Sequence, residues 1–124
     1  FEQVVTHLEG MGFEHDERGW WYGEVEWEDG RDQGVFIRIW NSDNDLYDAM
    51  IVDSIFASQE DITPKKALEL AEGYQHGIAM RGEAFVVRDS VPIADVDESE
   101  VMSAIQSVAL IADILESELG GDDF

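Results

Sequence analysis

The chain has 124 residues, enough for one hydrophobic core and too few for two ordinary ones, so we expect a single domain over residues 1–124. Asp and Glu number 29 against 7 Lys and Arg, a formal charge of -22 that excludes nucleic acid and anionic membrane surfaces as favoured partners. The absence of cysteine excludes disulfides and thiolate metal sites, and it is compatible with the cytoplasmic location that we expect.

The first half of the chain predicts a helix followed by three strands. Apolar residues recur at helical spacing over residues 1–11, and glycines end this segment. Apolar and polar residues alternate over residues 20–27, and Asp29-Gly30 is a favoured hairpin turn pair. A second strand is expected over 35–40. A third, over 46–57, carries apolar residues on both faces, as a strand covered on each side does.

The second half predicts a helix, a hairpin and a long final helix. Thr63-Pro64 begins the first of these helices, which we expect to end at Gly77. Two short strands follow, over 78–80 and 84–87, and the last helix runs from a cap at Asp97 to Leu119. The order α-β-β-β-α-β-β-α, with short turns between strands, indicates an α+β fold in which helices pack on an antiparallel sheet.

In the second half, KKALELAEGYQHG leads into the hairpin IAMRGEAFVVRDSVPI and then the helix ESEVMSAIQSVALIADILESEL. With these segments, the element order is similar to that of the type III secretion chaperone-like fold, and in particular of the YbjN-like family of bacterial proteins described as sensory-transduction regulators. The resemblance implies a cytoplasmic, dimeric protein with a chaperone-like, adaptor or regulatory role. No residue in these segments is a catalytic signature.

Residues that could support catalysis are few. His7, His15 and His76 share no spacing that would bring two of them to one metal ion, and the chain contains no phosphate-binding loop or serine nucleophile motif. Asp43, Asn44 and Asp45 with Asp48 could hold a hard cation, yet a solvated turn is the better reading because the glycine and distal glutamate of a calcium loop are missing. We therefore expect no catalytic residues, metal or cofactor.

Apolar residues outside the predicted core are the better guide to function. On the last helix, Leu110 and Ile114 fall opposite the core stripe, among small serines. They form a contact surface unless another element of the chain covers them. On the sheet, aromatic residues occupy both faces of the first two strands, and helices have to cover them or leave them as contact surfaces. The candidate protein-contact residues are Leu110, Ile114, Trp21, Trp27, Phe36 and Trp40.

These observations favour a protein-binding module that is not an enzyme and that forms a homodimer and engages a protein partner. The alternative is a small-ligand-binding or enzymatic domain whose pocket is lined by the same aromatic residues. The acidic surface either serves a function or keeps the protein soluble, as in a salt-adapted cell.

Overall fold

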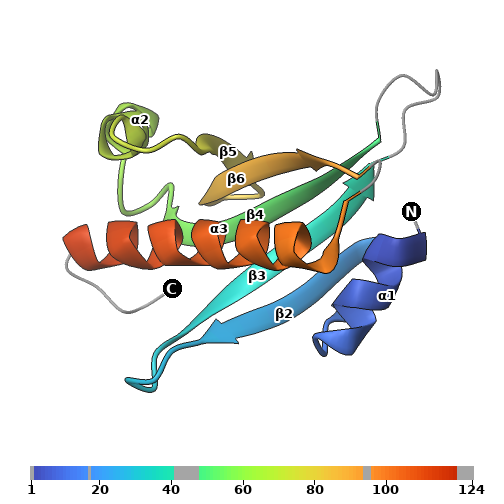
Figure 1. Cartoon of the computed structure of the whole chain (residues 1–124). Helices are drawn as coiled ribbons and strands as arrows, with labels where there is room; N and C mark the ends of the chain where they lie inside the picture. Colours follow the sequence, from blue (N-terminus) through green and yellow to red (C-terminus); the bar gives the residue numbers. More distant parts are fainter. Residues whose placement is uncertain (1, 17, 41–47, 94–95, 120–124) are drawn as a thin grey trace.

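One antiparallel sheet organises the molecule. The computed structural model describes residues 2–16, 18–40, 48–93 and 96–119. Within them the strands follow the order β1-β2-β3-β4-β6-β5, and each pairs antiparallel with its neighbours (Figure 1). The elements are α1 (Glu2–Gly10), β1 (Glu14–His15), β2 (Trp20–Glu26), β3 (Asp32–Trp40), β4 (Ala49–Ser58), α2 (Pro64–Ala71), β5 (Gly77–Arg81), β6 (Ala84–Pro92) and α3 (Glu98–Glu118).

The predicted α+β class and the order of its elements are confirmed, with differences at several boundaries. The short strand β1 was not predicted; it pairs with β2 through Glu14 and His15. Strands β3 and β6 extend beyond the short runs expected for them. Helix α2 ends at Ala71 and not near Gly77, because Glu72 caps it and the amide of Tyr74 turns back to the carbonyl of Ala71 at 3.0 Å.

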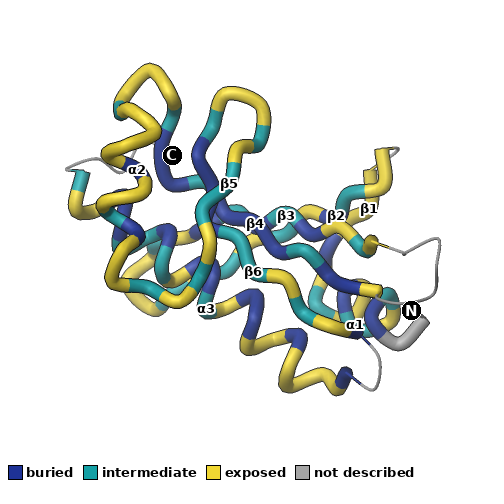
Figure 2. Tube along the Cα trace, turned by 90° about the horizontal axis from the view of Figure 1, so that it is seen from above, coloured by how far each residue is buried: buried dark blue, intermediate teal, exposed yellow. Residues whose placement is uncertain are grey.

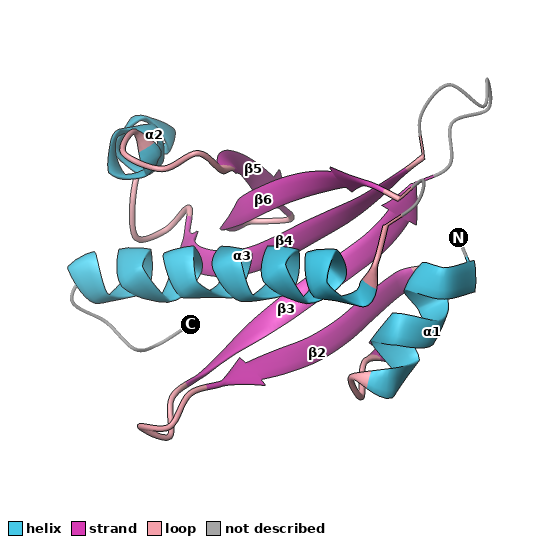
Figure 3. Ribbon diagram, viewed as in Figure 1, coloured by secondary structure: helices cyan, strands magenta, loops and turns pink. Residues whose placement is uncertain are grey.

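Helices α1 and α3 both lie on the same face of the sheet (Figures 1 and 3). The strand register aligns Trp21 with Ile37 and Ile37 with Val52 on this covered face. Along α3 the residues alternate between buried and exposed, as the apolar stripe predicts (Figure 2). Its buried apolar residues are Val101, Ala104, Ile105, Val108, Ala109, Ala112 and Leu115.

A close approach on the covered face depends on a glycine in β2. A Cβ atom at Gly23 would lie 2.6 Å from the ring of Phe13, a distance that side-chain atoms do not tolerate. Phe13 comes three residues after the end of α1 and is buried. The glycine therefore lets this ring pack against the strand and joins the end of α1 to the core.

The opposite face of the sheet is curled. The guanidinium of Arg81, at the end of edge strand β5, lies 4.3 Å from the ring centroid of Trp20 on β2. In the sheet order β6, β4 and β3 lie between these two strands, so a flat sheet would hold them roughly 19 Å apart at the usual strand spacing of about 4.8 Å. The two long side chains span part of this distance, and curvature of the sheet toward this face supplies the rest.

Candidate functional site

The six predicted contact residues lie on two sides of the sheet. Trp21 lies on the covered face of β2 and belongs to the core, and Trp27, in the loop that follows β2, packs partly against that core. Phe36 and Trp40 lie on the opposite face. We call this second face the arginine face; by register it carries Trp20, Tyr22, Phe36, Arg38, Trp40, Asp53 and Arg88, and Arg81 reaches it from β5.

Trp21 is not available to a partner. Only 8% of its surface is exposed, and its ring lies 4.7 Å from the ring of His15 on β1. The prediction that Trp21 is a contact residue is therefore wrong. The strand β1, which the sequence pattern did not indicate, contributes to the cover of Trp21 in addition to the helices.

The ring of Phe36, on the arginine face, is in contact with two side chains of the same face. The guanidinium of Arg81 lies 3.9 Å from the ring centroid of Phe36, and the ring centroid of Tyr22 lies 4.9 Å from that of Phe36. Burial lowers the pKa of Arg81 because it penalises the charged form. Phe36 is thus a member of a cation–π cluster within the chain and is half-buried.

An ion pair lies at the centre of the arginine face. The carboxylate of Asp53 has no exposed surface and accepts hydrogen bonds of 2.7 and 2.8 Å from the guanidinium of Arg88. This bidentate contact raises the pKa of Arg88. The arginine face is accordingly stabilised by its own charges, while Trp40 at its end is 43% exposed.

Trp27 and Leu110, predicted on two separate surfaces, line one hollow. The Trp27–Leu110 hollow lies between the loop that joins β2 to β3 and the outer side of α3, and its lining residues are Glu26, Trp27, Glu28, Asp29, Leu110 and Asp113. Leu110 is 47% exposed, whereas Trp27 packs partly against the core. Ile114, one turn further along α3, is half-buried. A predicted helix residue and a predicted sheet residue therefore belong to one site.

Backbone hydrogen bonds hold the loop beside the hollow. The amide of Trp27 donates to the carbonyl of Arg31 at 2.9 Å, and the amide of Gly30 donates to the carbonyl of Trp27 at 3.0 Å. Gly30 has a φ of 84°, the left-handed conformation that the Asp29-Gly30 pair predicted. The backbone that bears Trp27 is thus restrained before any partner arrives.

An ion pair joins this loop to α3. The Arg31 guanidinium lies 2.8 Å from a carboxylate oxygen of Asp113 and also donates to the hydroxyl of Ser117 at 3.2 Å. These contacts span more than eighty positions of the chain, and no local pattern indicated them. They place the loop and the helix as the two walls of the hollow.

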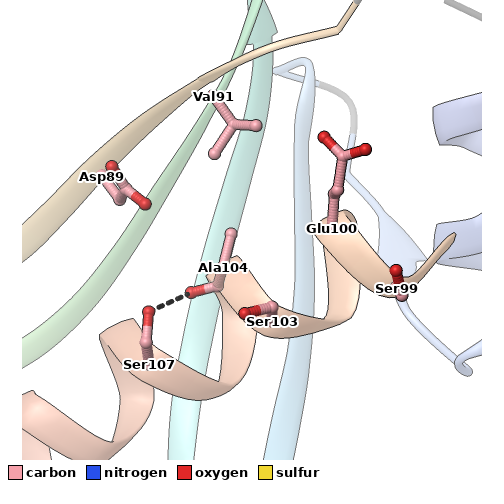
Figure 4. A pocket seen from close by; sticks show the side chains of 7 residues that line it. All are labelled: Asp89, Val91, Ser99, Glu100, Ser103, Ala104 and Ser107. Carbon is pink, nitrogen blue, oxygen red and sulfur yellow. Dashed lines mark hydrogen bonds between the residues drawn. The ribbon is translucent and has the colours of Figure 1, made fainter. Parts of the chain in front are cut away.

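A second hollow lies between β6 and α3 and is lined by serines and carboxylates (Figure 4). His76 is close to it, with its Nε2 atom 2.9 Å from the Ser107 hydroxyl and 3.8 Å from a carboxylate oxygen of Asp89. A nucleophilic triad needs the serine and the carboxylate on different ring nitrogens, whereas here both lie nearest the same one. The Ser107 hydroxyl also donates to the carbonyl of Ala104 at 3.3 Å. The three side chains are therefore not arranged as such a triad.

No metal site is found in the part of the chain that the structure describes, which contains no group of three or more His, Cys, Asp or Glu side chains placed to hold an ion. Of the loop considered for a hard cation, residues 43–45 lie outside the described residues, and Asp48 is exposed. None of the helices within the described ranges is long and apolar enough to cross a membrane.

Comparison with known proteins adds no relative. No family model matches the chain, and no curated protein matches it. The fold class and the site therefore rest on the chain's own residues.

Proposed function

We propose that this protein is a non-catalytic protein-binding module with a chaperone-like, adaptor or regulatory role in a bacterial cytoplasm. The observation that carries the proposal is the Trp27–Leu110 hollow, which is lined by an exposed leucine of α3 and by a tryptophan on a restrained loop. The resemblance to the YbjN-like family points the same way, since it implies binding without chemistry.

The energetics of the hollow suit a contact with another chain. Burying the exposed half of the Leu110 side chain would contribute about 1 kcal/mol, because full burial of a leucine contributes about 1.5–3 kcal/mol. Tryptophan is among the residue types that most often dominate binding free energy at interfaces. A restrained loop also lowers the entropy lost when a partner binds.

The experiment is a selection of peptides from a displayed random library on the immobilised protein. Selected peptides are then titrated by fluorescence anisotropy against the wild type, Leu110→Ser and the matched control Leu68→Ser. Leu68 is also an exposed helical leucine, but it lies on α2. We expect Leu110→Ser to weaken binding about tenfold, which corresponds to a loss of about 1.4 kcal/mol, and Leu68→Ser to leave it unchanged.

Peptides that bind Leu110→Ser as tightly as the wild type would contradict the proposed site. A selection that yields no binder, together with a metabolite that raises the melting temperature, would favour the alternative of a small-ligand-binding or enzymatic domain, because a specific ligand stabilises the native state by mass action.

A further inference from the structure

The Trp27–Leu110 hollow has a charge pattern that selects a partner. Four of its lining residues are carboxylates, namely Glu26, Glu28, Asp29 and Asp113. The ion pair with Arg31 offsets the charge of Asp113. The exposed Glu26 and Glu28 flank Trp27 directly in the chain. The apolar floor is therefore bordered by net negative charge.

Trp27 adds a second interaction with cations. The face of an indole ring attracts ammonium and guanidinium groups more strongly than other aromatic rings do, and the attraction grows when water is excluded. A lysine or arginine side chain could lay its aliphatic stem along the tryptophan while its charged end meets the carboxylates of Glu26 and Glu28. The hollow thus fits a side chain that is apolar along its length and cationic at its end.

The net charge of the chain favours the same occupant over the alternatives. A formal charge of -22 attracts cationic segments and speeds their encounter. A second copy of this chain carries the same charge, so its approach to the acidic border is opposed. A bare metal ion is also a poor fit, because no group of three or more of these carboxylates, within the described residues, is close enough to hold one.

We infer that the Trp27–Leu110 hollow binds a basic segment of another protein, with a lysine or arginine over Trp27 and a neighbouring apolar side chain on Leu110. The inference rests on the proposed protein-binding function and names the chemistry of its partner. It identifies the acidic border as a determinant of specificity.

The test uses three synthetic peptides that share the same leucine and phenylalanine positions and differ only in carrying lysine, glutamine or glutamate between them. Each is titrated against the full chain at about 0.15 M salt, where the Debye length is about 8 Å, so that distant charges are screened. We expect the lysine peptide to bind at least tenfold more tightly than the glutamine peptide, and the glutamate peptide not to bind.

A pair of matched double variants distinguishes the effect of the carboxylates at the hollow from the effect of the protein's overall charge. Glu26→Gln with Glu28→Gln removes two charges at the hollow, and Glu69→Gln with Glu72→Gln removes two exposed charges on or next to α2. Both doubles change the net charge equally. We expect the first to weaken the lysine peptide about fivefold to tenfold and the second to change its affinity less than twofold.

Each other result has a definite meaning. Equal binding of the lysine and glutamine peptides, with both lost in Leu110→Ser, would overturn the inference while the proposed function stands. If the two double variants weaken binding of the lysine peptide equally, only the overall charge of the protein attracts the peptide, and the inference is also overturned. A doubled mass by light scattering that Leu110→Ser abolishes, without peptide binding, would assign the hollow to a second copy. If none of the three peptides binds while the library selection yields peptides that Leu110→Ser weakens, the inference fails and the proposed function stands; if the selection also yields no binder, both fail.

Discussion

Asp53 shows how single residues determine this fold. It is a carboxylate with no exposed surface in β4, whose other residues are mostly apolar, and Arg88 on the neighbouring strand β6 neutralises it. Removing one partner of a buried ion pair leaves a charge without compensation in a medium of low polarity. The stability of the fold should therefore depend strongly on both partners of this ion pair.

We predict that Arg88→Met lowers the free energy of unfolding by about 3 kcal/mol, the lower end of the range for a broken buried pair, because water can reach the 36% of the arginine side chain that is exposed. Urea denaturation followed by tryptophan fluorescence measures it. The control is Arg38→Met on the same face, where the arginine is exposed and the change should stay within about 0.5 kcal/mol. Equal losses in both variants would contradict a special role for the pair.

The sequence predicted the burial of some side chains and not of others. The burial of α3 positions followed from helical spacing, and the exposure of Leu110 followed from its place opposite the stripe. Trp21 was misjudged because alternation gives the face of a strand and not what covers that face. The Arg81 contact with Phe36 and Trp20 depends on the curl of the whole sheet, which no local pattern encodes.

At the scale of elements, α3 illustrates how a helix boundary is determined. Asp97 has an extended backbone, and its carboxylate accepts hydrogen bonds from the Ser99 hydroxyl at 2.7 Å and from the Glu100 amide at 2.8 Å. These two bonds lower the pKa of Asp97. The lowered pKa means that the ionised carboxylate is the form that stabilises the helix start.

We predict that Asp97→Ala destabilises the protein at pH 7 and that its deficit relative to the wild type shrinks as the pH falls below 3.8, the ordinary pKa of the carboxyl. The sign follows because a lowered folded pKa gives stability above the unfolded pKa that is lost as the folded pKa is crossed. Asp97→Asn is the control, since an asparagine caps a helix but does not titrate. Urea midpoints at pH 7 and pH 3 measure the stability of both variants. If the deficit of Asp97→Ala were the same at pH 3 as at pH 7, the charge of the Asp97 carboxylate would not be what stabilises the helix start.

The elements that sequence patterns predicted best are those with strong local signals. The caps at Thr63 and Asp97 and the turn at Gly30 were all predicted at the correct residues. The end of α2 was not, because helical spacing of apolar residues continues to Tyr74 although the backbone turns at Ala71. Strand β1 is too short for alternation to indicate it, and only its pairing with β2 defines it.

At the scale of the whole molecule, the charge of -22 has two effects, and salt weakens both. Repulsion between like charges destabilises the compact state, and salt weakens that repulsion. Attraction of a basic partner strengthens binding, and salt weakens that attraction too. Stability and affinity should therefore move in opposite directions as the salt concentration rises, which separates a charge kept for a partner from one kept for solubility alone.

We predict that the urea midpoint of the chain at pH 7 rises between about 0.01 M and 1 M sodium chloride, as the Debye length falls from about 30 Å to about 3 Å. The same series at pH 4.1, near the isoelectric point, is the control, because little net charge remains there for salt to screen. A midpoint that does not change with salt at pH 7 would show that self-repulsion does not limit stability. Unfolding in low salt would indicate a protein adapted to a salty cell. A chain that stays folded in low salt, and that there binds the lysine peptide most tightly, uses its acidic surface for recognition.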